Sequence, residues 1–185
     1  MSSVVLRLVL FAVISGWLLR ISWQSLRAVR SHGFYRFFAW EAIVALVLIN
    51  SRAWFSDPLA MRQMASWSLL LASLVMLALG FRLIAAGKPT SQRQDRTLLS
   101  FEKTSVLVTT GIYRYIRHPL YGSLLLLAWG AFLKGITWYS ACAVAAATVC
   151  LMATAKADEA ECVRYFGGSY EQYMRRTKMF VPLLF

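Results

Sequence analysis

The sequence is poor in charged residues and in the side chains that build metal centres or disulfide frameworks. Only 15% of its 185 residues are charged, and it has two histidines and three cysteines. Cys142, Cys150 and Cys162 form no CxxC pair, and the first two stand inside an apolar run. A disulfide scaffold is therefore excluded as a class. With only His32 and His118, a multi-histidine centre is excluded as well, and we expect no metal site.

The sequence is rich in apolar residues. Hydrophobic residues make up 59% of the chain, and the mean hydropathy is +0.57. Soluble domains average about 45–50% apolar and about 25% charged residues. Both differences indicate an all-α, polytopic membrane protein whose main partner is the lipid bilayer. At this length the chain is expected to form a single domain.

Five apolar runs predict about five transmembrane helices, since a helix needs about 20 apolar residues to cross the hydrocarbon core. The runs cover residues 4–23, 37–51, 63–81, 119–133 and 136–155. Only Lys134 and Gly135 separate the last two runs. Such a short connection predicts a tight hairpin of antiparallel neighbouring helices.

The formal net charge of +12 is distributed unevenly between the predicted loops. Sixteen of the twenty Lys and Arg residues lie in the first loop, in the 82–117 loop and in the tail. The other four lie in the N-terminus, the second loop and the hairpin tip. The positive-inside bias then predicts an N-terminus outside and a C-terminus in the cytosol. Because topology accounts for the basic residues, nucleic acid is not an expected partner.

The start of the fourth run is the most informative local segment. Pro119 suits the first position of a helix and disfavours a helical His118, so His118 should flank the helix. A helix N-terminus offers unpaired N–H groups and a positive dipole end, which suit an anion. Arg117 and Tyr121 would cluster with His118 around it. The alternative reading is a basic, aromatic membrane-interface belt that needs no ligand.

The tail predicts a cytosolic C-terminal helical cap. The fifth apolar helix should continue past the membrane until Gly167 and Gly168 end it. Ser169 and Gln172 have the spacing of a capping box, which would open a short further helix.

Three acidic residues follow the fifth span by one to two turns: Asp158, Glu159 and Glu161. Because the hairpin pairs the fourth and fifth helices, these carboxylates should lie near the start of the fourth. They are either part of a site there or ordinary surface salt bridges, which contribute little.

Three motifs in order resemble the isoprenylcysteine carboxyl methyltransferase and phospholipid methyltransferase family. They are Leu107-Val-Thr-Thr-Gly-Ile-Tyr-Arg-Tyr-Ile-Arg-His-Pro-Leu-Tyr121, the pair Asp158-Glu159, and Phe166-Gly-Gly-Ser-Tyr-Glu-Gln-Tyr173. The resemblance covers roughly residues 98–182. We therefore expect one integral membrane domain over residues 1–185, with N-terminal spans in 1–97 and a methyltransferase-like, cofactor-binding region in 98–185.

The resemblance implies S-adenosylmethionine as cofactor, bound on the cytosolic side, and methyl transfer to a lipid-like or prenylcysteine-like carboxylate or amine. It places Glu159 in the catalytic role. It implies that the cofactor-binding residues are Ser105, Val106, Leu107, Val108, Tyr113, His118, Pro119, Leu120, Tyr121 and Asp158.

The substrate half of the resemblance is weaker. The prenylcysteine enzymes carry an arginine where this chain has Thr154, so substrate binding falls to Thr154 and the nearby Lys156. Lysine does not replace arginine at a bidentate carboxylate site. A non-catalytic relative of the fold is thus one alternative. Another is an NADPH-dependent membrane sterol-type reductase, although no acidic residue follows Tyr121 at the positions where those enzymes have one.

The charge distribution yields a direct test of sidedness. A reporter fused after Phe185 is expected on the cytosolic face, because the residues next to the last span are strongly basic. Reporter activity in cells measures this. A reporter found on the opposite face would reject the proposed topology.

Overall fold

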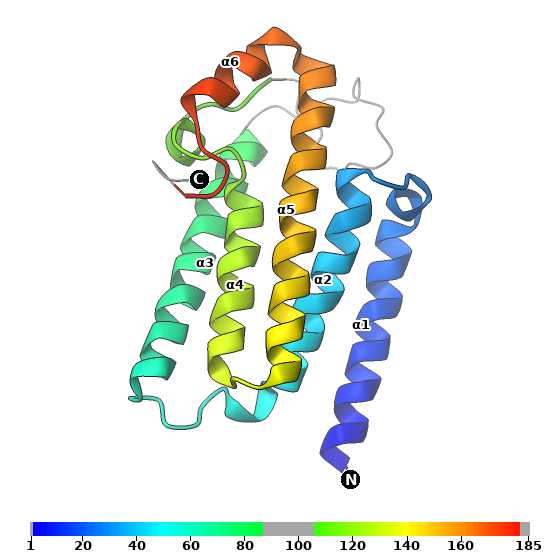
Figure 1. The fold of residues 1–185 in the computed structure, drawn as a ribbon, viewed down its shortest axis with the longest axis vertical. Helices are drawn as coiled ribbons and strands as arrows, with labels where there is room; N and C mark the ends of the chain where they lie inside the picture. The colour runs from blue at the N-terminus through cyan, green and yellow to red at the C-terminus, as the bar shows by residue number, and fades with distance from the viewer. Residues whose placement is uncertain (1, 87–105, 182–185) are drawn as a thin grey trace.

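The computed structural model describes residues 2–86 and 106–181, with side chains from residue 4 onward, and is built from helices (Figure 1). Five longer helices form the body, and a short one crosses one end. In chain order they are α1 (Ser2–Arg27), α2 (His32–Ile49), α3 (Met61–Ala86), α4 (Pro119–Lys134), α5 (Trp138–Phe166) and α6 (Gly168–Arg176). Two 3-10 turns, η1 (Ser51–Ala53) and η3 (Gly111–Arg114), lie between them.

The expected all-helical architecture is confirmed in the described residues and is consistent with a polytopic membrane protein, but the number of candidate spans is smaller than expected. Four helices, α1, α2, α3 and α5, are long and apolar enough to cross a membrane. The fourth predicted span, α4, has only 16 residues. Pro119 fixes its start, and Gly135, whose backbone is extended, ends it, so the apolar run cannot lengthen at either side.

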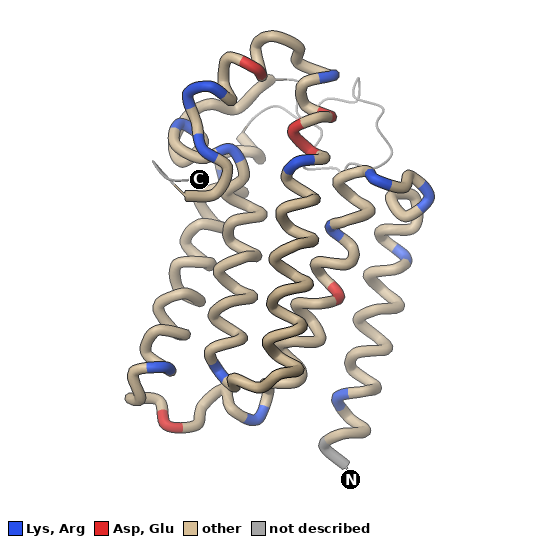
Figure 2. The backbone as a smooth tube through the Cα atoms, in the orientation of Figure 1, with Lys and Arg blue, Asp and Glu red and all other residues tan. Residues whose placement is uncertain are grey.

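The start of α1 and the segment that follows α6 lie toward opposite ends of the bundle (Figure 1). Most of the Lys and Arg residues that the structure describes lie toward the end that carries α6 (Figure 2). This agrees with the unequal charge distribution in the sequence, while the side of the membrane that each end faces remains a prediction.

The α4–α5 hairpin forms as expected. Thr137 caps α5: its hydroxyl accepts a hydrogen bond from the Ser140 amide at 3.2 Å, and the Ser140 hydroxyl accepts one from the Thr137 amide at 2.8 Å. This reciprocal capping box closes the hairpin tip and fixes where α5 begins.

Two boundaries differ from the expectation. Helix α3 continues through Arg82 to Ala86, so the loop begins later than the charge pattern suggested. Helix α6 starts at Gly168 after Gly167, whose φ of 59° favours glycine, and it has no side-chain cap. The expected Ser169–Gln172 capping box is therefore wrong, because the turn makes Gly167 the N-cap and starts the helix two residues earlier than that box would.

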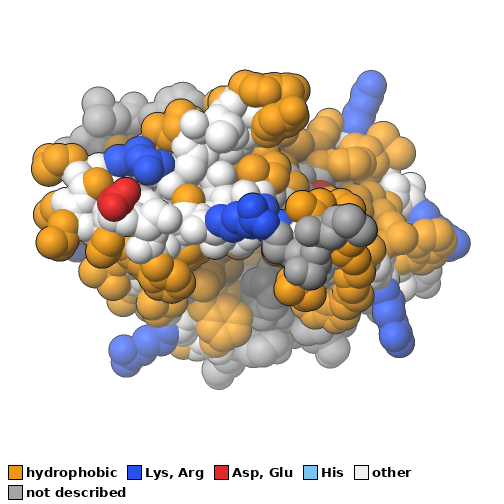
Figure 3. Space-filling view, turned by 90° about the horizontal axis from the view of Figure 1, so that it is seen from below, with side chains coloured by type: hydrophobic (Ala, Val, Ile, Leu, Met, Phe, Trp, Pro, Cys, Tyr) orange, Lys and Arg blue, Asp and Glu red, His pale blue; other side chains and the backbone are white. Residues whose placement is uncertain are grey.

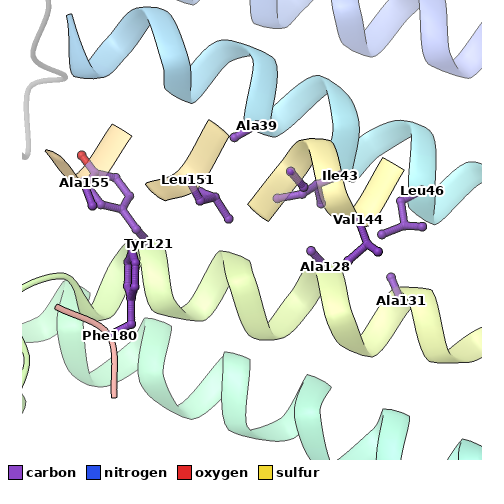
Figure 4. Packing of buried hydrophobic residues seen from close by; sticks show 11 residues of the cluster. Ala39, Ile43, Leu46, Tyr121, Ala128, Ala131, Val144, Leu151, Ala155 and Phe180 are labelled. Atoms are coloured by element: carbon purple, nitrogen blue, oxygen red, sulfur yellow. The ribbon is translucent and has the colours of Figure 1, made fainter. Parts of the chain in front are cut away.

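The core is a layer of small and branched side chains between α2, α4 and α5 (Figure 4). Ala39, Ile43 and Leu46 of α2 meet Val144 and Leu151 of α5 there. At one end of this layer Phe180, from the segment after α6, packs near Tyr121 of α4 (Figure 4). Phe180, from the segment after α6, thus belongs to the core.

Helices α3 and α4 approach each other closely through glycine and serine. A Cβ on Gly130 would lie 3.0 Å from Leu70 and 3.3 Å from the carbonyl oxygen of Ser66. The hydroxyl of Ser66 donates to the Gly130 carbonyl at 2.7 Å, and that of Ser73 to the Ser123 carbonyl at 2.7 Å. Small residues and serine hydrogen bonds are typical of helix pairs in membranes.

The end opposite α6 is held by a buried lysine. Lys134 is fully buried, its ammonium lies 3.4 Å from the ring centre of Trp67, and it donates to Gln63 Oε1 at 3.0 Å. Arg62 donates to the carbonyls of Leu133 and Lys134 at the C-terminus of α4, at 2.9 and 2.7 Å. Cations at the end of a helix balance its dipole. Hydrophobic side chains cover much of the surface seen from this end (Figure 3).

Gly130→Val is expected to lower stability by about 1–3 kcal/mol, because added methyl groups would force α3 and α4 apart. Thermal unfolding of the purified protein in detergent measures the effect. Gly16→Val is the matched control, since a Cβ at Gly16 of α1 meets nothing within 4 Å. Equal loss in both variants would mean that helix propensity, rather than close packing, sets the result.

Candidate functional site

The segment after α6 runs beside the residues that lead into α4. Ile116 and Lys178 form an isolated parallel bridge. The amide of Arg117 donates to the Lys178 carbonyl at 2.8 Å, and the amide of His118 donates to the Met179 carbonyl at 3.2 Å. These bonds fix the C-terminal segment against the start of α4, where the sequence predicts a site.

Glu159 lies between two cationic groups at this point. Its Oε1 accepts a hydrogen bond from Arg117 Nε at 2.7 Å and lies 3.2 Å from His118 Nε2. On the other side of the ring, His118 Nδ1 lies 3.5 Å from Asp158 Oδ2. The imidazole also stacks on the ring of Tyr121, with centroids 5.5 Å apart. A histidine that flanks a helix and two carboxylates one turn past a membrane span are therefore brought together.

Arg117 connects this cluster to the C-terminus of α6. Its Nη1 donates to the carbonyl of Met174 at 3.2 Å and to the carbonyl of Thr177. These are among the carbonyls that a helix end leaves without intrahelical partners. One guanidinium thus holds α5, α6 and the approach to α4 together.

The cluster changes the acidity of both of its central groups. Burial opposes a charge on His118, but the carboxylates of Asp158 and Glu159 outweigh it and raise the histidine pKa above 6.5. Burial also opposes a charge on Glu159, but His118 and Arg117 outweigh it and lower the pKa of this carboxyl below 4.5. At neutral pH Glu159 is therefore ionised, and the raised pKa of His118 favours the protonated imidazole.

A cavity of about 120 Å³ opens beside this cluster, which we call the inner cavity. Its polar lining includes Arg117, His118 and Asp158. Most of its apolar and aromatic lining comes from the 107–121 motif and from the 166–173 motif. The aromatic side chains are Tyr113, Tyr121, Tyr170 and Tyr173. Tyr173 donates from its hydroxyl to the Tyr113 carbonyl at 2.7 Å, which fixes α6 over η3.

A second hollow of about 480 Å³, the outer pocket, shares Leu107 and Tyr173 with the inner cavity. Its charged residues are Arg114 and Arg176, and within the described residues neither has a hydrogen-bond or ion-pair partner. The outer pocket thus carries two cationic side chains and adjoins the inner cavity, which is lined by aromatic side chains.

Most of the cofactor residues implied by the family resemblance line the inner cavity. They are Leu107, Val108, Tyr113, His118, Pro119, Leu120, Tyr121 and Asp158. Val106 is exposed and lines neither hollow, and Ser105 lies outside the described residues.

The residues implied for catalysis and for substrate binding lie apart from the cavity surface. Glu159 is buried directly behind the lining, in contact with His118. Thr154 is buried and donates its hydroxyl to the Cys150 carbonyl at 2.7 Å, while Lys156 is exposed. Neither Thr154 nor Lys156 lines either hollow.

The sequence reasoning missed one polar contact, which joins the start of α2 to α5 just past the site. Glu161 accepts hydrogen bonds from the backbone amide of His32 at 3.0 Å and pairs with His32 Nδ1 at 2.6 Å, so its carboxylate caps α2. The two residues are 129 positions apart, and no local pattern joins them. The position of Arg114 and Arg176 around the outer pocket was also missed, because basic residues there were explained by topology.

This architecture and this cavity define a polytopic helical membrane protein with a charged, aromatic site at one end of its bundle. The chain belongs to the family described as "Protein of unknown function (DUF1295)", whose profile matches residues 18–177. No curated protein and no solved structure matches the chain.

Protonation of His118 should make the stability of the site depend on pH. Because the histidine pKa is raised on folding, its contribution is complete below pH 6.5 and is lost as pH rises through the raised pKa. His118→Gln is therefore expected to destabilise the protein more at about pH 6 than at about pH 9. Thermal unfolding of both proteins at both pH values measures this. A loss independent of pH would mean that His118 acts by packing alone.

Proposed function

We propose that the protein transfers a methyl group from S-adenosylmethionine to a lipid-like acceptor at the membrane. The observation that carries the proposal is that Asp158 and His118, 3.5 Å apart, both line one small aromatic cavity. It is the arrangement expected around a ligand that carries both a carboxylate and a positive charge.

The residues around the inner cavity suit the amino-acid end of the cofactor. The Leu120 amide in the first turn of α4 can hold a carboxylate, because it presents an N–H group at a positive helix end, and protonated His118 adds a positive charge beside it. Asp158 supplies a negative charge for the ammonium or the sulfonium. The faces of Tyr121 and Tyr170 add attraction for a cation.

The remaining part of the cofactor needs more room than 120 Å³. The outer pocket adds about 480 Å³ and meets the inner cavity at Leu107 and Tyr173. Pockets for ligands of this size typically have about 300–1,000 Å³. We assign the adenosine part to this wider hollow.

When bound, the cofactor supplies a methyl group on a positively charged sulfur. The acceptor's oxygen or nitrogen lone pair forms the new bond to the methyl carbon while the carbon–sulfur pair returns to sulfur. The protein's part is to position the acceptor in line and to exclude water. A carboxylate acceptor needs no base, so Glu159 is assigned to holding His118 and Arg117 in place, rather than to proton transfer.

The acceptor's charged group would meet other residues than those the resemblance implies. Thr154 and Lys156 do not line either hollow, whereas Arg114 and Arg176 do. Two guanidinium groups without described partners suit a carboxylate. We therefore transfer the substrate-carboxylate role from Thr154 and Lys156 to Arg114 and Arg176.

The same two arginines favour a second candidate function. Guanidinium groups also bind phosphates, and S-adenosylmethionine carries none, whereas NADPH does. An NADPH-dependent membrane sterol-type reductase would use Arg114 and Arg176 for the cofactor instead of the acceptor.

Binding measurements separate these functions. Calorimetric titration with S-adenosylmethionine is expected to show binding that Asp158→Asn weakens about tenfold, the loss of a charged hydrogen bond. Glu171→Gln, which removes an equal charge from the exposed face of α6, is expected to bind like wild type. Transfer of labelled methyl groups to a membrane lipid extract then tests turnover.

Each other outcome has a defined meaning. Binding of NADPH without binding of S-adenosylmethionine would replace the proposal with the reductase. Tight binding without methyl transfer to any lipid or lipidated peptide would identify a non-catalytic relative. Equal effects of Asp158→Asn and Glu171→Gln would remove Asp158 from the site.

A further inference from the structure

The first half of α1 has little contact with the rest of the bundle. Only 6% of its most apolar window is buried, against 33% for α2 and for α5. Its buried side chains, Leu18, Ser22 and Ser25, all lie in the second half of the helix. Figure 1 shows the N-terminal end of α1 standing apart from the other helices.

A groove of about 380 Å³ lies along this loosely packed half, between α1, α2 and the start of α5. Its walls are mostly apolar and include Leu8, Phe11, Ala45 and Leu48. The volume lies in the range of ligand pockets, and its shape follows helices that cross the bilayer. Lipid chains are the molecules that surround such a surface.

One charged group, Arg7, lines this groove. It is half-buried, and it has no hydrogen bond or ion pair to any part of the chain that the structure describes. The carboxylate of Glu41 on α2 is engaged by the Ser15 hydroxyl at 2.6 Å, roughly 12 Å farther along the helix axis from Arg7. A charge beside apolar walls is costly unless an opposite charge is supplied.

We propose that the groove binds an anionic glycerophospholipid, with one acyl chain along α1 and α2 and the phosphate on Arg7. Arg7 lies within the first two turns of α1, at the depth where headgroups meet the hydrocarbon core. Arginine forms paired hydrogen bonds with phosphate. The hydroxyl of Tyr139, the groove residue from α5, can donate to the same headgroup.

The charge argues for a lipid over a helix from a second copy of the chain. An apolar helix seated in the groove would cover Arg7 without neutralising it. An anionic lipid fills the groove and supplies the missing charge in one molecule. The lipid would join the first half of α1 to α2 and α5, where the protein itself makes few contacts.

The test uses the full-length protein in nanodiscs of phosphatidylcholine, titrated with phosphatidylglycerol. Native mass spectrometry is expected to show a retained phosphatidylglycerol on the wild type. Arg7→Gln should weaken its binding about tenfold, the effect of one charge-assisted hydrogen bond. Ala45→Phe should weaken it too by filling the acyl groove. Arg20→Gln, on an exposed position of the same helix outside the groove, should bind like wild type.

Several results would overturn the proposal. Unchanged lipid retention in both Arg7→Gln and Ala45→Phe would do so, as would equal losses in Arg7→Gln and Arg20→Gln. Should Arg7→Gln fail to fold, Ala45→Phe and the preference for phosphatidylglycerol over phosphatidylcholine decide the question. Efficient cross-linking between copies through Leu8→Cys, whatever the lipid, would assign the groove to a dimer contact instead.

Discussion

The carboxylate of Glu159 lies between the guanidinium of Arg117 and the ring of His118, and the geometry of the site follows from this contact. Glu159 belongs to the extension of α5 beyond the span, and the two cationic groups belong to the approach to α4. Arg117 also holds the last carbonyls of α6. Three segments are therefore oriented by one cluster of charges.

A buried ion pair of this kind adds little stability of itself, because its desolvation opposes the Coulomb attraction. Its effect is on which arrangement of these three segments the chain adopts. Removing one member would leave an uncompensated charge, which costs about 3–5 kcal/mol in typical buried pairs. The tail thus has one favourable arrangement over the start of α4, and the inner cavity is the space left beside it.

The sequence was sufficient for the helical membrane architecture, the α4–α5 hairpin and the pairing of Asp158 and Glu159 with His118. Each of these depends on local signals: apolar runs, the Pro119 helix start and the two-residue spacer. It was not sufficient for the contact between His32 and Glu161, since two residues so far apart in sequence are joined only by packing. The substrate role that the resemblance implies for Thr154 stays a prediction, since this residue, one turn before the acidic pair, donates to the Cys150 carbonyl and does not line the inner cavity.

The order of synthesis gives one feature of the fold a further consequence. Thr177 accepts from Arg117, Met179 accepts from the amide of His118, and Phe180 packs against Tyr121. All three follow α6, and Thr177 lies 60 positions after Arg117. A nascent chain can therefore insert its helices and close its hairpin before it has made the residues that complete the site. Ligand affinity in this protein is thus acquired late in synthesis, and a chain cut before Thr177 would reach the membrane without it.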